Sequence, residues 1–312
     1  MEISILLAEQ ILAMFLTMAV GFGVVRAGLF KTEDSRIISN MVVYICNPCV
    51  VVHSFQIELT DDKIKGLMIA IGLSVVVHMV LIIGSEILSF IFHFNSIEKA
   101  SIIYTNAGYL VIPLVGAVLG EEWVFYTTAF ILVQTVLMWT HGVKLIGQEK
   151  ELNIRKILCN PNVIAMIIGI ALFALEIRLP TVVDSCVSGF GDMISPASMM
   201  VIGMVIGDVD LKWVFRQKRP YLICLLRLIV FPLIAVVAFA GLERSGIHPD
   251  AEYILMIVLI ATSPPAAAMI TQLAQIYGKD SRYASVINVM SVIFCIITMP
   301  VMVLSYEMLI AL

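Results

Sequence analysis

Long apolar runs separated by short polar connections dominate this sequence and restrict its fold more than any other feature. A helix that crosses a bilayer needs about 20 mostly apolar residues, and such runs follow one another almost from end to end. Of the 312 residues, 61% are hydrophobic and 13% are charged, a balance that does not suit a soluble domain. We therefore predict an all-α polytopic membrane protein. No basic, aromatic-rich patch occurs, which argues against nucleic-acid binding.

We predict ten transmembrane helices with no soluble domain between them. The longest connection divides the chain into residues 1–147 and 160–312, with residues 148–159 as a linker. The expected spans are residues 3–27, 37–56, 66–93, 96–120, 122–147, 160–179, 181–208, 220–242, 252–277 and 283–311.

The distribution of Lys and Arg predicts the orientation, because these residues are enriched in cytoplasmic loops. Of the 19 such residues, fourteen lie in the set of connections that includes the linker and four lie in the opposite set. Arg227 lies within a span. We therefore expect a multi-pass protein of the cell membrane with a cytoplasmic linker and both termini outside the cytoplasm.

The two halves of the chain resemble each other. The second span reads "YICNPCVVVHSF" and the seventh "DMISPASMMVIG", each with a proline among small or polar residues. The fourth and ninth spans are each followed by a glycine, a charged turn and a tyrosine, Tyr126 or Tyr283. Because five spans per half is an odd number, the second half enters the membrane inverted. Such a 5+5 inverted repeat is typical of secondary transporters.

The fourth and ninth spans are both interrupted near their middles. The fourth contains Asn106, Gly108 and Pro113, and the ninth contains Pro264 and Pro265. Unwound backbone at membrane depth is tolerated only where it is buried in protein or lines a cavity. Proline suits the first turn of a new helix, and the N-terminal end of that helix attracts anions. A proline in one span alone could be a simple kink. Breaks in corresponding spans of an inverted repeat indicate a transporter binding site.

At these residues the chain resembles the auxin efflux carrier family, and it looks more like bacterial members than plant ones. Asn106, Ile112, Pro113 and Leu114 match the family's pattern in the fourth span. Similar segments are "NPCVVVHSF" in span two, "GDMISPASMMVIG" in span seven, "ATSPPAAAMITQLAQIYG" in span nine and "IITMPVMVL" in span ten. The resemblance covers all ten spans. It departs at Val111, where the family commonly has glycine, and in the short central loop.

The resemblance implies an elevator-type secondary transporter from the same superfamily as the bile-acid transporters. Spans one, two, six and seven would form a dimerising scaffold, which implies a homodimer. Spans three to five and eight to ten would form a mobile transport unit, in which spans four and nine cross at their breaks. The implied substrates are small carboxylates such as malonate, malate, lactate or auxin-like acids. We expect no enzymatic activity, cofactor or metal.

The candidate substrate-binding residues lie in the two interrupted spans: Asn106, Pro113, Thr262, Ser263, Pro264 and Pro265. Asn106 can bond to substrate or cap a half-helix. Thr262 and Ser263 can bond instead to carbonyls of their own helix. No Lys or Arg is assigned to this site, so half-helix ends and amide groups would hold the anion.

Four ionisable residues inside predicted spans need separate explanations. Asp192 lies deep in span seven, where protonation, gating and structural hydrogen bonding are all open roles. His53 in span two can titrate near neutrality or simply pack. Glu86 and Arg227 lie at similar depths, about 10 Å from the cytoplasmic ends of spans three and eight. Because a buried pair is more favourable than two lone charges, we predict a structural ion pair between them.

Two other functions stay open at this point. A sodium-coupled symporter of the bile-acid type would need clustered oxygen ligands near the crossing, for which Asn106, Ser263, Gln272 and Asn288 are a thin set. A membrane sensor on a transporter-like frame would usually carry a soluble output domain, which this sequence does not contain.

Overall fold

The computed structural model describes residues 2–147 and 158–311, and within these ranges the regular secondary structure is helical apart from one isolated β-bridge. Most of the expected linker, residues 148–159, therefore lies outside the described residues. In chain order, the first half contains α1 (Glu2–Arg26), η1 (Thr32–Asp34), α2 (Ser35–Met41), η2 (Val42–Cys46), α3 (Asn47–Ser54), α4 (Asp61–Phe92), α5 (Ser96–Ile103), α6 (Ala107–Leu119), η3 (Glu121–Trp123), α7 (Val124–Leu137), η4 (Met138–Gly142) and α8 (Val143–Gly147).

The second half contains α10 (Pro161–Ala174), α11 (Thr181–Asp192), α12 (Ile194–Gly207), α13 (Leu211–Arg216), α14 (Arg219–Leu225), η5 (Leu226–Val230), α15 (Phe231–Glu243), α16 (Ala251–Thr262), α17 (Ala268–Ile276) and α18 (Ser281–Ile310). Each expected span coincides with between one and four of these consecutive elements.

Seven helical stretches in the described residues are long and apolar enough to cross a membrane. Three further apolar helices are shorter: α6, α10 and α16. The short lengths of α6 and α16 follow from the breaks in spans four and nine, because each break divides one expected span into two half-helices. The fold is therefore that of an all-helical, multi-pass membrane protein.

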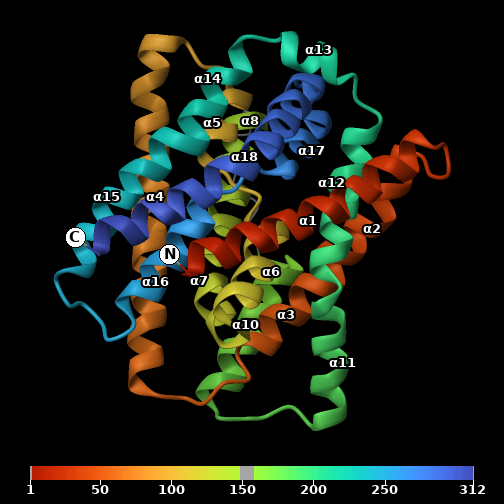
Figure 1. The fold of residues 1–312 in the computed structure, drawn as a ribbon. Coiled ribbons are helices and arrows are strands. Elements are labelled where there is room, and N and C mark those ends of the chain that lie inside the picture. The colour runs from red at the N-terminus through yellow and green to blue at the C-terminus, as the bar shows by residue number, and fades with distance from the viewer. Residues whose placement is uncertain (1, 148–157, 312) are drawn as a thin grey trace.

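One group of helices consists of α1, α2, α3, α10, α11 and α12, which we call the first group. Its core is the close packing of α1 against α12 (Figure 1). A Cβ atom on Gly203 would lie 2.0 Å from the Met18 carbonyl oxygen, and one on Gly21 would lie 2.3 Å from that of Met200. Only glycine permits this backbone approach, as in other small-residue contacts between membrane helices.

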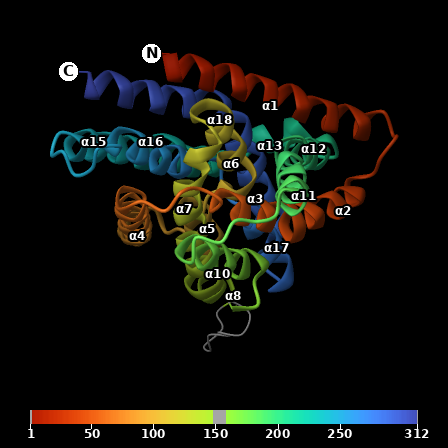
Figure 2. The same cartoon turned by 90° about the horizontal axis from the view of Figure 1, so that it is seen from below.

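The second group consists of α4 to α8 and α14 to α18. The long helix α4 forms one edge of the molecule in Figure 1 and packs against α7 and α16. Helix α18 packs against α15 and α17 and also reaches α1, so the N- and C-terminal ends of the chain lie close together in Figures 1 and 2. The half-helix pairs α5–α6 and α16–α17 lie inside this group.

Three helices contain π-helical segments, and two of these segments directly precede a proline. Segment η2 ends just before α3, which has Pro48 in its first turn, and η5 ends just before α15, which has Pro232 there. Proline cannot donate a backbone hydrogen bond, and a wider turn accommodates the missing donor. Segments of this kind often mark functional sites.

Candidate functional site at the crossing of two broken helices

The two helix breaks meet and bond to each other through their backbones. The Asn106 N–H donates to the Pro265 carbonyl at 2.9 Å, and the Ala267 N–H donates to the Tyr104 carbonyl at 3.0 Å. Thr105 and Ala266 lie between these bonds as an antiparallel bridge. Backbone groups that lose their helical partners at one break thus form hydrogen bonds with the other break. These bonds offset the free-energy cost of unwinding a helix away from water.

Side chains from α7 and α18 complete the crossing in matching ways. The Gln134 side chain accepts from the Thr105 N–H and hydroxyl, both at 2.9 Å, and donates to the Thr105 carbonyl at 2.9 Å. On the other break, the Ser291 hydroxyl accepts from the Ala266 N–H at 3.1 Å, and Asn288 donates to the Ala266 carbonyl at 2.7 Å. Each repeat therefore supplies a clamp for its own break.

Arg227 holds the carbonyl ends of both broken helices. Its guanidinium donates to the carbonyls of Ile102 at 3.2 Å, Thr262 at 2.8 Å and Pro264 at 3.2 Å. Its side chain is fully buried. These carbonyls come from the last turn of α5, the end of α16 and the adjoining break, so one side chain ties the two half-helices together.

The predicted ion pair between Glu86 and Arg227 is wrong. Glu86 accepts both of its charged hydrogen bonds from Lys99, at 2.9 and 3.0 Å, and this carboxylate side chain is 45% exposed. Arg227 bonds to carbonyls instead. The physical reason is that a helix break leaves carbonyl groups without N–H partners, and these groups can satisfy a buried guanidinium without any carboxylate.

A cavity of about 170 Å³ lies beside the crossing, between the two groups of helices. We call it the crossing cavity. Its lining from the first group includes Ser39, Asn40, Tyr44, Asn47, Asn160 and Asn162, and its lining from the second group includes Thr105, Asn106, Tyr109, Gln134, Thr135, Ala268 and Gln272. Among the described residues that line it, none is Asp, Glu, Lys or Arg. The lining thus combines polar and apolar side chains and carries no formal charge among the described residues.

Three amide groups in the crossing cavity have an atom without a hydrogen-bond partner, and one of these atoms is Asn162 Oδ1. Asn106 is 5% exposed, and its Nδ2 atom is unpaired. Asn47 is 7% exposed, and its Oδ1 atom is unpaired. Buried polar groups are usually satisfied, so unpaired ones beside a cavity indicate a site for another molecule. The Asn106 side chain makes no capping bond to α6, so the structure gives no support to its alternative role as a cap.

Two half-helices begin at the crossing cavity. Helix α6 begins at Ala107 and α17 begins at Ala268, and residues from the first turns of both helices line the cavity. The first N–H groups of a helix have no partner within it and carry about half a positive charge together. The cavity therefore combines two helix N-termini with neutral amide and hydroxyl groups, a setting suited to a small anion.

One hydrogen bond crosses the cavity from one group of helices to the other. The hydroxyls of Ser39 in α2 and Tyr109 in α6 lie 2.9 Å apart. Both residues line the cavity. Any relative movement of the two groups must break this bond, whereas the clamps of Gln134, Asn288 and Ser291 lie wholly inside the second group.

The other residues assigned to the ninth span serve the crossing itself. The hydroxyls of Thr262 and Ser263 bond back to the carbonyls of Val258 at 2.7 Å and Leu259 at 2.8 Å. Neither residue lines the crossing cavity. The carbonyls of Pro264 and Pro265 accept from Arg227 and from the Asn106 N–H. In this conformation, then, the alternative of bonding to their own helix holds for Thr262 and Ser263.

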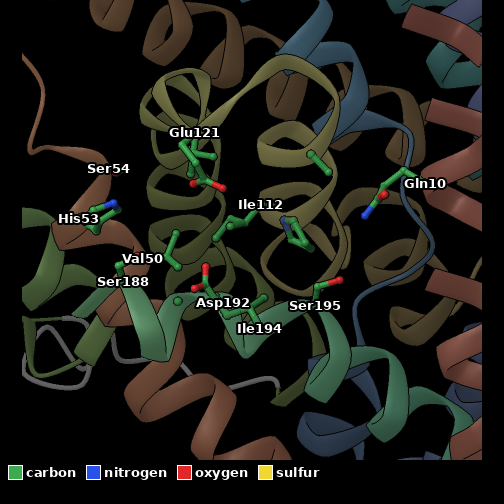
Figure 3. A pocket seen from close by; sticks show the side chains of 14 residues that line it. Gln10, Val50, His53, Ser54, Ile112, Glu121, Ser188, Asp192, Ile194 and Ser195 are labelled. Carbon is green, nitrogen blue, oxygen red and sulfur yellow. The ribbon is translucent and has the colours of Figure 1, made fainter. Parts of the chain in front are cut away.

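A second cavity of about 200 Å³ contains three other predicted residues, Pro113, His53 and Asp192 (Figure 3). Pro113 thus lies more than a turn along α6 from the crossing cavity and does not line it. His53 Nδ1 lies 2.8 Å from the Asp184 carboxylate. Asp192 ends α11, is exposed and lines the second cavity, as does Glu121. The second cavity is therefore acidic where the crossing cavity is uncharged.

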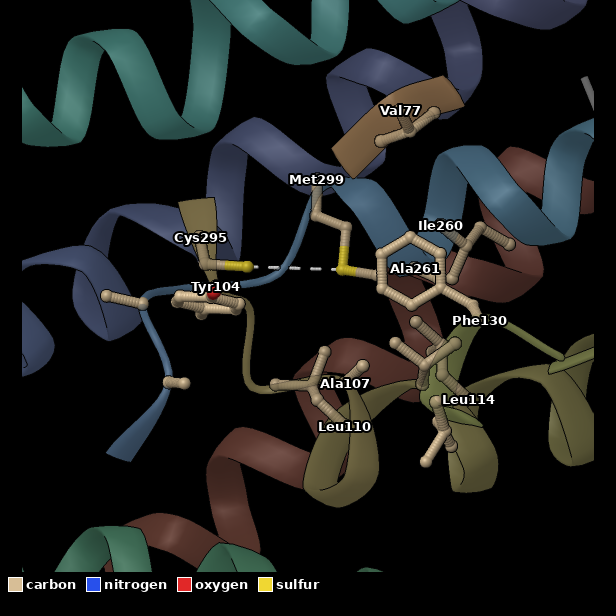
Figure 4. Packing of buried hydrophobic residues seen from close by; sticks show 14 of the residues in the cluster. Val77, Tyr104, Ala107, Leu110, Leu114, Phe130, Ile260, Ala261, Cys295 and Met299 are labelled. Carbon is tan, nitrogen blue, oxygen red and sulfur yellow. Dashed lines mark hydrogen bonds between the residues drawn. The ribbon is translucent and has the colours of Figure 1, made fainter. Parts of the chain in front are cut away.

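Apolar side chains pack around the crossing. Tyr104, Ala107 and Leu110 lie beneath Cys295 and Met299 of α18, whose sulfur atoms are 3.9 Å apart (Figure 4). All five residues are at most 5% exposed. Since this packing separates the crossing from surrounding lipid, the hydrogen bonds of the breaks act in a medium of low polarity.

Sequence reasoning missed the clamps, although a signal was present. Gln134 lies eight positions after Tyr126, and Ser291 lies eight positions after Tyr283. These tyrosines are the pair by which the two halves were matched, so the repeat itself places Gln134 and Ser291 at equivalent positions. A polar residue repeated inside two apolar spans is a sign of a polar partner.

Comparison with known protein families identifies the same two halves. A family model described as "Membrane transport protein" matches residues 6–156 and, a second time, residues 149–303. The two matches together cover nearly the whole chain and divide it at the linker. A search of curated proteins gave no match.

Proposed function

Because the chain belongs to the membrane transport protein family, which is the auxin efflux carrier family, we propose that it is a secondary carrier of small organic carboxylates. The observation that carries this proposal is the crossing cavity. It joins the N-termini of α6 and α17 to the unpaired amide of Asn106, and no charged side chain among the described residues lines it. A cavity of about 170 Å³ suits a small molecule. Weak, neutral contacts allow the release that transport requires.

We propose that Asn106 and the junction at Pro264 and Pro265 form the substrate site. The Asn106 amide would donate to one carboxylate oxygen, and free N–H groups of α6 and α17 would donate to the other. The prolines act through their backbone, because they hold the break open and orient α17. Asn47 would contact the rest of the substrate from the first group of helices.

The same geometry supports an elevator mechanism in a chain of ten spans arranged as a 5+5 inverted repeat. The first group would be the scaffold and the second group the transport unit. The site-forming breaks and their clamps all lie in the second group, so they can move as one body, while the bond between Ser39 and Tyr109 would break. The second cavity, with His53 and Asp192, would serve as a gate or protonation site on the other side of α6. A homodimer formed by the scaffold, a cytoplasmic linker and termini outside the cytoplasm complete the proposal.

A sodium-coupled symporter is less well supported. Asn288 and Ser291 use their polar groups on the Ala266 backbone, and the Ser263 hydroxyl bonds to its own helix. The hydroxyl oxygens of Ser263 and Ser291 are therefore already engaged in hydrogen bonds, whereas Asn288 uses its amide nitrogen.

Uptake of radiolabelled carboxylates into liposomes that contain the purified protein tests the proposal. Proton and sodium gradients are varied separately. We expect saturable uptake of small carboxylates that competes with unlabelled substrate. Uptake that requires sodium would favour the symporter, and absence of uptake for every carboxylate tried would exclude the carrier function proposed.

A further inference from the structure

Among the described residues, Arg227 is the only arginine that bonds to the crossing, and it does not line the crossing cavity at which α6 and α17 begin. Its three acceptors are carbonyls of Ile102, Thr262 and Pro264. In the described ranges, no carboxylate bonds to it, and its side chain is fully buried. A buried cation without a counterion needs an explanation beyond helix packing.

The charges at the crossing can be added from their parts. The C-terminal ends of α5 and α16 each carry about half a negative charge, and the N-terminal ends of α6 and α17 each carry about half a positive charge. Without Arg227, the partial charges of these four helix ends sum to about zero. Arg227 is bonded to both C-terminal ends and neutralises them. The two N-terminal ends that face the crossing cavity are then left with about one positive charge between them.

From this sum we propose that Arg227 sets the charge of the substrate site and makes it selective for singly charged carboxylates over doubly charged ones. This inference rests on the proposed carrier function and adds the charge class of the substrate. A monoanion brings the loaded crossing close to neutrality. A dianion would leave one negative charge in a cavity whose lining contains no Lys or Arg among the described residues.

The unpaired groups of the cavity agree with a substrate of this kind. One donor, Asn106 Nδ2, and two acceptors, Asn47 Oδ1 and Asn162 Oδ1, lack partners. A carboxylate would accept from the donor, and a neutral hydroxyl or protonated carboxyl on the same molecule would donate to one of the acceptors. A second ionised carboxylate could not donate a hydrogen bond to the Asn47 oxygen, because both groups are acceptors.

Binding to the wild-type protein in detergent gives the first test, with thermal stabilisation or calorimetry as the readout. The probes are lactate, a monoanion, malonate, which becomes a dianion as pH rises, and lactamide, the neutral relative of lactate. From about pH 4.5 to about pH 7.5, the second carboxyl of malonate ionises. We expect malonate binding to weaken across this interval while lactate binding stays constant. Equal or tighter binding of the malonate dianion would overturn the inference but leave the carrier function intact.

Arg227→Gln, Arg227→Lys and a matched control give the second test. Arg244 also donates to a carbonyl, that of Leu309 at 3.1 Å, but it lies outside the crossing, so Arg244→Gln should change nothing. Arg227→Gln should weaken lactate binding on the order of 10-fold, because a nearby unit charge is lost. Lactamide binding should not change, and Arg227→Lys should retain most of the lactate affinity.

The outcomes separate the two proposals. If Arg227→Gln weakens lactate and lactamide equally, Arg227 is structural and the inference fails. If Arg227→Gln does not fold, the comparison of malonate with lactate on the wild-type protein still decides the matter. If no carboxylate binds the wild-type protein at any pH, the carrier function fails, and this inference fails with it.

Discussion

The backbone N–H of Asn106 donates to the carbonyl of Pro265 at 2.9 Å, which joins a break in the first half of the chain to a break in the second. Neither break can close into a continuous helix without removing a partner from the other. The interruptions therefore stabilise each other, and a site formed at their junction needs residues from both halves.

Replacing Asn106 with alanine should weaken substrate binding without harming the fold. Its side-chain Nδ2 atom has no partner in the protein, so nothing inside the protein loses a hydrogen bond. A bond from an amide to a carboxylate contributes about 1.5–3 kcal/mol, which corresponds to roughly 10- to 100-fold in affinity. Calorimetry with a transported carboxylate measures this change.

Asn288 provides the matched control for that experiment. Its side chain donates to the Ala266 carbonyl at 2.7 Å, so Asn288→Ala removes a bond inside the protein. We expect the melting temperature of the Asn288 variant to fall, while that of Asn106→Ala stays near the wild-type value. If Asn106→Ala is the less stable protein and binds substrate normally, Asn106 is a structural residue.

Gln134→Leu should destabilise the crossing of the two broken helices. The substitution leaves the N–H, hydroxyl and carbonyl of Thr105 without the partner they share. An unsatisfied buried polar group costs about 1–3 kcal/mol. Thr140→Val is the control in the same span, because the Thr140 hydroxyl bonds only to carbonyls of its own helical stretch. Thermal unfolding in detergent should separate the two variants, and similar melting temperatures would show that Gln134 does not hold the break.

Neutralising Glu98 should lower the melting temperature more than neutralising Glu86. Glu98 is fully buried and accepts from Arg219, from the Tyr283 hydroxyl at 2.7 Å and from the Asn95 N–H at 2.9 Å. The Arg219 side chain is 47% exposed, so water would partly solvate it after the loss of its partner. We therefore expect Glu98→Gln to lower the free energy of unfolding by about 1–3 kcal/mol, less than is usual for a fully buried pair. Glu86→Gln removes only a partly exposed pair with Lys99 and should cost about 0–1 kcal/mol. A larger fall in melting temperature for Glu86→Gln than for Glu98→Gln would indicate that Glu86 is the more important of the two for stability.

The position of the crossing could be predicted from the sequence, because proline and a repeat are local and countable signals. Pro264 and Pro265 mark one break, Asn106 lies at the other within the matching span, and the resemblance to the auxin efflux carrier family implies that the two cross. The structure confirms that the breaks bond to each other. It also places Asn106 in a cavity that no charged side chain among the described residues lines.

The partners of the buried ionisable residues could not be predicted in the same way. A sequence shows which side chains are charged but not which backbone carbonyls lack a hydrogen-bond partner. Arg227 was therefore predicted to pair with Glu86, a carboxylate at a similar depth in the membrane. Glu86 reaches Lys99 across the turn between α4 and α5, and that contact depends on how the turn folds back. Pro113 was assigned to the crossing because it shares a helix with Asn106, yet its distance along α6 carries it to the other cavity.

Replacing Pro264 and Pro265 together with alanine tests the crossing as a whole. Alanine restores two N–H donors and favours helix, so α16 and α17 should approach a continuous helix. The carbonyls of both residues would then turn towards bonds within the helix and away from Arg227 and the Asn106 N–H. Pro300→Ala is the control, because Pro300 lies inside the unbroken helix α18.

We expect the double variant to insert in the membrane, since a continuous apolar helix suits a bilayer, but to lose both transport and stabilisation by substrate. The loss follows from geometry: α17 would no longer begin at the crossing cavity, so its free N–H groups would be removed from the site. Pro300→Ala should keep both activities. If the prolines only kink a structural helix, the double variant will instead be less stable but still stabilised by substrate to the normal extent. That result would refute a site formed at the crossing of α6 and α17.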